Sequence, residues 1–395
     1  MRSAKIIVLF LLCVMSGVIW ADPHALASPE DYVLADDIKL STGKVLRAGT
    51  RWYQPPGIDR LRRELADKSF DGDISRARQI VFGYELVHRT YGTIGEGRRD
   101  GRPPLAAGRV MNCANCHSGG GTVPYAWPFF RTLTYYGLAE QGEDGVFFGG
   151  LGYKRDARSR ARDCARECGG TVMIDDDSPE MDALVAWLVA VRDGIYEGEG
   201  LLIPEFKTPS DVDKIPGATT PLFPGVLDMK ADPQAGADVY QARCASCHGD
   251  DGTGVWGGED AFTFPPLAGE GSFSHAGGPL MVPIGAAFLA RNMPLAQSNA
   301  LSPQDALDVM AYVATLPRSS VWWQDYYFRH APCERPPWLP LHVGAVPEGF
   351  PFTAAQVQFG PWRPVADWLA GEECRAKNPP GTPALDRDFD AREAR

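Results

Sequence analysis

Apolar residues recur at helical spacing in two pairs of segments along this 395-residue chain. The first segment begins after Asp73 and stops at Gly92, and the second follows Ser178, an N-cap residue with a proline next to it. A third, shorter segment leads into Cys244, and a fourth follows Ser302, which opens a capping-box pattern. Apolar residues three and four positions apart predict a helix in each segment.

Three other stretches lack a sustained period. Residues 28–73 are polar and turn-rich, and we expect an N-terminal extension that wraps the surface. Residues 201–232 are rich in proline and glycine and predict a linker. Residues 318–395 are rich in Trp, Tyr, Phe and Pro, which predicts a long arm packed over the helices and a disordered charged tail from residue 386. A surface that docks a partner is the alternative interpretation of these aromatic residues.

The beginning of the chain predicts an export signal. Two basic residues precede an apolar run at 6–19, which is shorter than a membrane-spanning helix requires. We expect residues 1–21 to be a signal peptide, with cleavage at that point or after Ala27, and the mature protein to lie in the periplasm. An uncleaved membrane anchor is the alternative.

Two short motifs carry the clearest chemistry. The chain reads Cys-Ala-Asn-Cys-His from Cys113 to His117, and Cys-Ala-Ser-Cys-His from Cys244 to His248. Two thiols at this spacing each form a thioether with a vinyl group of a haem, and the histidine ligates the iron. Chance can explain one such match, but two matches in one exported chain predict two covalently bound haem c groups. The four thiols are Cys113, Cys116, Cys244 and Cys247.

Each motif lies between two predicted helices, as in a c-type cytochrome domain. The predicted fold is therefore mainly α, with two cytochrome c-type haem domains in tandem, at 74–200 and 233–317, and long irregular N- and C-terminal extensions. In such domains the two helices cross where a small residue meets an aromatic ring. Gly83 and Trp187 are the candidates in the first domain.

Each haem iron needs a further ligand, which sets its potential and its access to substrate. In the second domain, Met293 lies in a loop that ends at Pro294, where a c-type domain presents an axial methionine. Core packing is the usual role of a methionine, and Met281 is the reserve candidate. We also expect the carbonyl of Pro265 to accept a hydrogen bond from His248, which would fix the ring tautomer.

The first domain has no comparable methionine, since Met173 lies beside acidic residues and Met181 falls within a predicted helix. It has Cys164, within a run of six cations that is interspersed with acidic residues. Such a run is usually a solvated helix face. The whole chain has a formal charge of -11, however, which argues against nucleic acid as a partner. In an acidic chain, cations around a free thiol favour a thiolate and attract an anion. The cations are Lys154, Arg155, Arg158, Arg160, Arg162 and Arg166.

Four cysteines are left after the signal and the haem motifs. Cys333 and Cys374 lie outside the predicted haem domains, and an oxidising compartment predicts a disulfide between them. Cys164 and Cys168 are the other two. A disulfide between them is the alternative to ligation by Cys164, although cysteines four apart on a helix are poorly placed for that geometry.

These residues resemble those of the thiosulfate dehydrogenases, periplasmic dihaem cytochromes c that join two thiosulfate ions into tetrathionate. The likeness covers residues from about 75 to 320 and combines an Arg-rich segment with Cys164. Cys168 departs from it, because the family often has a serine there. The runs that carry the likeness are Asp177-Ser178-Pro179-Glu180-Met181, Cys-Ala-x-Cys-His-Gly at Cys244, Gly269-x-x-Ser272-Phe273 with Gly277, Ala286-Ala287-Phe288, Asn292-Met293-Pro294 and Leu301-Ser302.

The resemblance implies an active site at the first haem. Cys164 would be the second ligand of that iron, opposite His117, and would bond to the outer sulfur of thiosulfate docked near Arg160. Electrons would pass to the second haem, held by His248 and Met293, and then to a periplasmic acceptor such as a cytochrome c. Other small sulfur oxyanions remain possible substrates.

Two functions of other classes stay open. The chain could be an electron-transfer dihaem subunit of another periplasmic dehydrogenase, in which case Cys164 is structural. It could also be a dihaem peroxidase, which needs acid and base residues at an open haem. The remaining histidines offer little support for a peroxidase, because His88 falls on a predicted helix and the others fall in loops.

Overall fold

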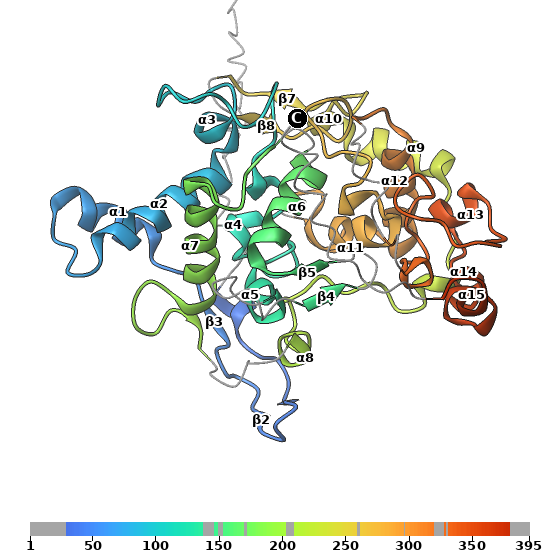
Figure 1. Cartoon of the computed structure of the whole chain (residues 1–395), viewed down its shortest axis with the longest axis horizontal. Helices are drawn as coiled ribbons and strands as arrows, with labels where there is room; N and C mark the ends of the chain where they lie inside the picture. Colours follow the sequence, from blue (N-terminus) through green and yellow to red (C-terminus); the bar gives the residue numbers. More distant parts are fainter. Residues whose placement is uncertain are drawn as a thin grey trace, which may run out of the picture.

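Two groups of packed helices, joined and flanked by irregular segments, make up most of the computed structural model of this chain (Figure 1). The structure describes residues 29–136, 146–148, 153–169, 172–202, 209–258, 261–295, 297–319, 328 and 331–379. The predicted signal peptide, the aromatic residues at 322–327 and the charged tail lie outside these ranges. Within them, no helix is long and apolar enough to cross a membrane.

The first helix group is built on α2 (Ile74–His88) and α7 (Pro179–Asp193). The carboxylate of Asp73 accepts a hydrogen bond from the backbone of Arg76, and Ser178 caps α7 with a proline at its first position, as predicted. α2 ends at His88, before the expected Gly92, and a separate short helix α3 (Thr90–Ile94) follows. The turn between them is tied to the first motif, because the Thr90 hydroxyl donates to the Leu86 carbonyl and accepts from the Cys113 backbone.

The second helix group contains α9 (Pro233–Arg243), α10 (Ala245–His248), α11 (Val282–Asn292) and α12 (Pro303–Thr315). Asp232 and Ser302 cap α9 and α12, and Ser302 also donates to the Asp305 carboxylate, which completes the polar pair that the sequence pattern predicts. Tyr240 on α9 and Leu307 on α12 are fully buried between the helices.

Both groups use a glycine where the helix before the motif crosses the helix after it. A Cβ atom on Gly83 would collide with the Ala183 carbonyl oxygen and lie 2.9 Å from Trp187 Cβ, which confirms the predicted crossing. A Cβ atom on Gly236 would collide in the same way with the Asp308 carbonyl. A hydrogen atom in place of a side chain therefore lets each helix pair approach closely.

Residues 29–73 do not simply cover the surface, as the sequence predicts, because they contribute short elements and buried side chains to the core. They form η2 (Pro29–Tyr32), β1 (Ile38–Lys39), β2 (Val45–Leu46), β3 (Tyr53–Gln54) and α1 (Ile58–Asp67). Trp52 and Tyr53 are buried and their rings pack on Phe130, with centroids 5.2 and 4.3 Å away. β3 pairs antiparallel with β6 (Gly200–Leu201). This segment thus completes the core of the first helix group, because its aromatic side chains enter that core at positions with no regular period.

The remaining elements of the first group surround its motif. They are η3 (Cys113–Asn115), α4 (Ser118–Gly121), α5 (Phe130–Tyr136), β4 (Val146–Phe148), β5 (Tyr153–Arg155) and α6 (Ala157–Gly169). Buried Leu133, Ala157 and Leu188 pack α5 and α6 against α7. The predicted linker is mostly irregular in its described part, with α8 (Pro209–Val212) and η4 (Val226–Asp228). Buried Asp211 accepts two hydrogen bonds from Ser41, which ties the linker to the N-terminal segment.

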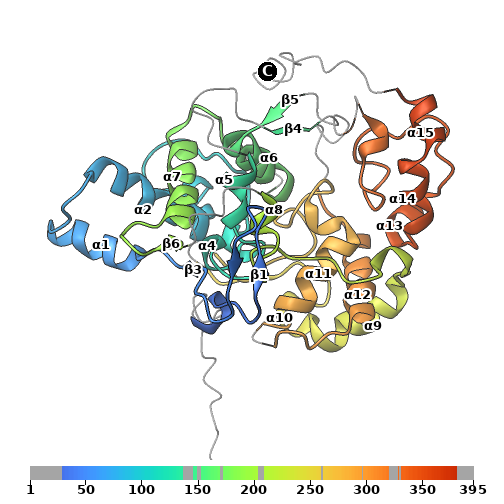
Figure 2. The ribbon, with the colours of Figure 1, turned by 90° about the horizontal axis from the view of Figure 1, so that it is seen from below.

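The C-terminal arm contains more regular structure than the sequence predicts. Its helices α13 (Ala354–Phe359), α14 (Arg363–Ala370) and α15 (Glu372–Lys377) are too short for a clear apolar period. Both views show them beside the second helix group (Figures 1 and 2). Trp362 is buried in the core of that group, and its backbone donates to the Leu227 carbonyl.

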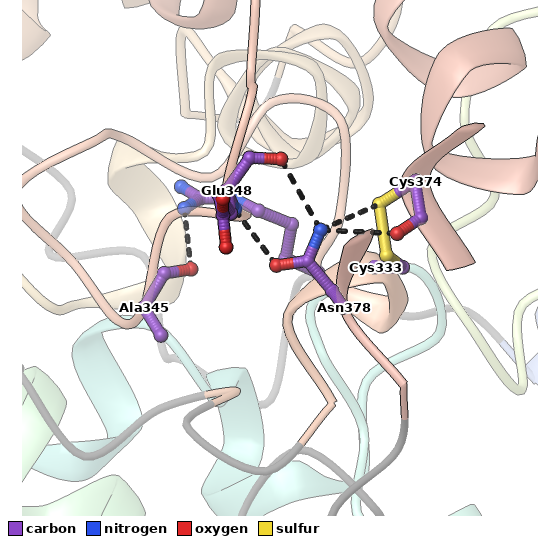
Figure 3. The surroundings of a disulfide bond; sticks show 6 residues. Cys333, Ala345, Glu348, Cys374 and Asn378 are labelled. Carbon is purple, nitrogen blue, oxygen red and sulfur yellow. Dashed lines mark hydrogen bonds between the residues drawn. A yellow bond between two sulfur atoms is a disulfide. The ribbon is translucent and has the colours of Figure 1, made fainter. Parts of the chain in front are cut away.

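A disulfide joins Cys333 to Cys374, as predicted. Figure 3 shows Asn378 beside it, with its amide donating to the carbonyls of Cys374 and Glu348. Nearby, Arg335 is buried and donates to three backbone carbonyls, including that of Ala345. The bond and these contacts close the arm on itself.

We predict that peptide mapping without reduction will recover Cys333 and Cys374 as one linked pair. A loop with 41 residues of separation stabilises a fold by up to about 4 kcal/mol when it is closed. The Cys333→Ser/Cys374→Ser double variant should therefore unfold its arm first, as seen by faster proteolysis after residue 331. Alkylation of both thiols in the native, unreduced protein would contradict this prediction.

Gly83→Ala should lower the free energy of unfolding by about 1–3 kcal/mol, because the added methyl group forces the two helices apart. The gain in helix propensity, about 0.5–1 kcal/mol, has the opposite sign. Gly278→Ala is the matched control, since a Cβ atom there meets nothing within 4 Å. Denaturant unfolding of both variants tests the crossing, and equal stabilities would refute it.

Candidate functional site

The structure brings His117 and Cys164 together across the first helix group. His117 ends the first motif, and Cys164 lies on α6, yet His117 Nε2 and Cys164 Sγ are 4.0 Å apart. Metal–nitrogen and metal–thiolate bonds, such as those of zinc, are about 2.0 and 2.3 Å long. A metal ion bonded to both atoms from opposite sides would hold them at about the sum of those two bond lengths, which is close to the observed distance. This donor pair therefore fits the axial ligands of a haem iron.

The ring of His117 is held with Nε2 facing Cys164. His117 Nδ1 is 2.5 Å from the Trp127 carbonyl oxygen, a hydrogen bond that fixes the tautomer and leaves Nε2 for a metal. Phe129 packs on the same ring, with centroids 4.6 Å apart.

The glycine run after His117 has a structural reason. Gly119, Gly120 and Gly121 all have positive φ, and a Cβ atom on Gly121 would collide with the Phe129 ring. The Gly120 carbonyl accepts a hydrogen bond of 2.8 Å from Trp187 Nε1 on α7. A tight left-handed turn therefore anchors the motif to the helix crossing.

Cys164 lies on the same face of α6 as Arg160 and Cys168, which are four residues before and after it. The sulfur atoms of Cys164 and Cys168 are 3.5 Å apart, a hydrogen-bond contact and not a disulfide. The pKa of the Cys164 thiol lies well below its usual value, because Cys168 hydrogen-bonds to it and because Arg160 and His117 favour the thiolate, although burial opposes the shift. These neighbours therefore favour the thiolate form of Cys164.

The motif cysteines have the opposite character. Burial raises the pKa of the Cys113 thiol to about 11 and that of Cys116 to about 12. Burial likewise raises the pKa of Cys244 to about 11. The surroundings of Cys164 therefore differ from those of the motif cysteines, because they favour the thiolate and not the thiol.

Some arginines of the basic run form ion pairs with aspartates that follow it in the sequence. Arg158 donates to the Asp182 carboxylate at 2.6 Å, and Arg162 donates to Asp176 at 2.7 Å. Arg162 also contacts Asp163, and both side chains are buried. Arg160 is half-buried, and its charge acts on Cys164. The side chains of Lys154 and Arg155 lie outside what the structure describes.

The second motif has the hydrogen bond between its histidine and the Pro265 carbonyl that the sequence predicts. His248 Nδ1 is 2.8 Å from the Pro265 carbonyl oxygen, which leaves Nε2 for a metal. Burial lowers the pKa of His248, while the bond to Pro265 opposes the shift, so the imidazole is neutral, as a ligand must be. Cys244 is the N-cap residue of α10, and Cys247 lies within that helix, next to His248.

Met293 and Met281 lie at opposite ends of α11. Met293 follows the helix directly and packs with Trp127 and Phe288, where the two helix groups meet. Met281 precedes the helix and packs against Ala276 and the C-terminal arm. The described residues contain no group of three or more His, Cys, Asp or Glu side chains that could hold a metal.

Sequence reasoning missed Trp127 and Asn292 as parts of this site. Trp127 supplies a backbone carbonyl, which no side-chain pattern reveals. Asn292 reaches the first helix group through its amide, 3.0 Å from the Tyr125 carbonyl oxygen. Its position directly before the candidate ligand Met293 was the signal in the sequence that could have identified it.

Comparison with known proteins gives a consistent result. The model of the cytochrome c family matches residues 233–317. Thiosulfate dehydrogenase of Psychrobacter arcticus is 25% identical over 255 residues, which are 65% of this chain and 68% of that protein. The Stutzerimonas stutzeri protein of the same name is 26% identical over 292 residues, 71% of this chain and 79% of its own. That of Allochromatium vinosum is 39% identical over 92 residues, 23% of this chain and 34% of its own.

A solved structure shares the fold. It is the "as isolated" form of thiosulfate dehydrogenase (TsdBA) from Marichromatium purpuratum, with a TM-score of 0.52 and 24% identity. The match covers 68% of this chain and 50% of that one, so it spans about half the length of the solved chain. The chain is therefore similar to thiosulfate dehydrogenases over about two thirds of its length, and its residues 233–317 match the cytochrome c family.

Proposed function

We propose that this protein is a periplasmic dihaem cytochrome c that oxidises thiosulfate to tetrathionate. The observation that carries the proposal is the Cys164 thiolate, 4.0 Å from His117 Nε2 and close to the charge of Arg160. The names of the relatives supply thiosulfate as the substrate. The shared glycine crossings at Gly83 and Gly236 support two cytochrome c domains in tandem.

Each helix group contains the residues for one haem. Cys113 and Cys116 would form the thioethers of the first haem, with His117 and Cys164 on its iron. Cys244 and Cys247 would form those of the second, with His248 and Met293 as its iron ligands. When bound, the haems supply two one-electron acceptors, which together take the electron pair that thiosulfate oxidation releases.

Arg160 and Cys164 do the chemistry of the first half-reaction. The guanidinium attracts the dianion toward the same face of α6 that carries the thiolate. Cys164 Sγ then forms a sulfur–sulfur bond to the outer sulfur of thiosulfate, and the pair of reactants loses two electrons. The product on the protein is a cysteine that carries an S–SO₃⁻ group.

The second half-reaction needs no further oxidation. The outer sulfur of a second thiosulfate attacks the sulfur atom that lies between Cys164 Sγ and the sulfonate group of the adduct. The bond from that atom to Cys164 breaks, and Cys164 leaves as a thiolate, as in thiol–disulfide exchange. Tetrathionate is released with the charge conserved. A low pKa makes Cys164 a good leaving group, and the contact with Cys168 contributes to that low pKa.

Electrons leave through the second helix group. Ligation by Met293 would give its haem the higher potential, since a methionine ligand raises it. The acceptor is a periplasmic electron carrier, which we expect to be a cytochrome c.

Cys164→Gly should remove thiosulfate oxidation, with a loss in kcat of roughly a thousandfold or more, because the nucleophile is gone. It should also remove the thiolate-ligated low-spin spectrum of one haem. Cys168→Ser should keep both, because a hydroxyl also donates a hydrogen bond to the thiolate. Haem reduction and tetrathionate formation are followed after thiosulfate is added, with sulfite and tetrathionate as comparisons.

This experiment uses protein whose intact mass shows two attached haems. If thiosulfate leaves both haems oxidised in the parent protein, the chain is an electron carrier of another dehydrogenase. If Cys168→Ser loses activity and Cys164→Gly keeps it, the assignment of the ligand is wrong. Equal, mild losses would favour a disulfide between the two cysteines.

Met293→Gly should lower the potential of the second haem and slow electron exit, while binding of thiosulfate stays within about twofold, since the substrate site lies in the other helix group. Met281→Leu is the control and should leave both spectra unchanged. Redox titration and steady-state kinetics with a soluble acceptor measure these effects. An unchanged spectrum in the Met293 variant would assign the ligand to Met281.

A further inference from the structure

We propose that Asn292 and Trp127 are positioning residues for His117, so that the second helix group sets the ligand geometry of the first haem. The proposal rests on the proposed function in one respect, the presence of a haem at each motif. It assigns no step of thiosulfate chemistry to either residue.

The carbonyl that holds His117 belongs to a strained segment. Tyr125 has φ of 63° and Trp127 has φ of 44°, a region that bulky L-residues rarely adopt. Such a conformation is unfavourable for an L-residue and persists where the surroundings enforce it. The His117–Trp127 hydrogen bond therefore depends on the contacts that hold residues 125–127 in place.

Those contacts come partly from the linker. The Tyr125 backbone N–H donates to the Gly217 carbonyl at 2.9 Å. The Thr220 hydroxyl donates to the Tyr125 carbonyl at 2.7 Å and accepts from the Trp127 backbone at 3.4 Å. The linker thus fixes both peptide groups around residue 126.

The remaining contacts come from α11 of the second helix group. Asn292 Nδ2 donates to the Tyr125 carbonyl at 3.0 Å and to the Phe288 carbonyl of its own helix at 2.9 Å. The guanidinium of Arg291 lies 4.7 Å from the centre of the Tyr125 ring. The Trp127 indole packs on the Phe288 ring, with centroids 4.4 Å apart and an angle of 32° between the planes.

These contacts join the two ligand loops. Asn292 immediately precedes Met293, and Met293 packs in the same cluster as Trp127 and Phe288. One asparagine amide therefore links the loop of the second haem's methionine to the peptide that accepts the His117 hydrogen bond. Positions in one helix group control the ligand of the other.

The sign of the effect follows from the hydrogen bond. A bond from Nδ1–H to a carbonyl makes the imidazole a stronger donor to the metal, which stabilises the oxidised iron. Without the Asn292 amide, the strained segment relaxes and the His117 bond lengthens. The first haem's potential should then shift in the positive direction, although the substituted residue lies in the second group.

The experiment is a spectroelectrochemical titration of Asn292→Ala and Phe288→Leu, without thiosulfate. Both variants should shift the potential of the thiolate-ligated haem upward, and the double variant should shift it by less than the sum, since both act on one segment. Asn292→Gln keeps an amide donor and should recover part of the shift. Asn378→Ala is the matched control, because that amide also bonds backbone carbonyls but lies in the C-terminal arm.

The absorption of the methionine-ligated haem shows whether Met293 is still bound. If Asn292→Ala or Phe288→Leu displaces Met293, Thr220→Val decides, because the Thr220 hydroxyl bonds the same Tyr125 carbonyl from the linker and lies outside the Met293 cluster. The proposal is overturned if the potential of the first haem is unchanged in both single variants, Asn292→Ala and Phe288→Leu. It is also overturned if Asn378→Ala shifts that potential as much as Asn292→Ala does. A parent protein without a thiolate-ligated haem would refute the proposed function instead, and the titration itself needs no activity toward thiosulfate.

Discussion

The site depends on one spacing, the 4.0 Å between an imidazole nitrogen and a thiolate sulfur. A shorter distance would exclude a metal ion, and a longer one would leave a ligand unbound. His117 ends its motif, and the bond from its Nδ1 to the Trp127 carbonyl holds its ring. The position of Cys164 depends on α6 packing against α5 and α7 through buried apolar side chains.

Two local features turn this spacing into reactivity. Charge on the Arg-rich helix α6 is partly compensated from outside it, because Arg158 bonds to Asp182 on α7 and Arg162 bonds to Asp176, which precedes α7. The influence on Cys164 then comes from Arg160 and from the sulfur contact with Cys168. The surroundings of Cys164 thus favour its thiolate, whereas burial raises the pKa of Cys113 and Cys116, although the Thr90 hydroxyl opposes that shift at Cys113.

Local signals predicted much of this arrangement. The caps at Ser178 and Ser302, the Gly83–Trp187 crossing and the Pro265 bond to His248 follow from short motifs whose geometry is fixed by neighbours in the sequence. The buried Trp52 and Tyr53 lay in a segment interpreted as surface, because two-residue strands show no period. The positive φ of Trp127 was equally invisible, since tertiary contacts impose it on a residue that disfavours it.

An acidic chain that handles a dianion faces a general repulsion. With a formal charge of -11, its long-range field disfavours the approach of thiosulfate, and the pairing of Arg158 and Arg162 with carboxylates weakens the local attraction further. Recognition must therefore come from short-range contacts, within about 8–10 Å at physiological salt. In the proposed function, Arg160 and Cys164 would satisfy this requirement from one helix face, since residues four apart on a helix are neighbours.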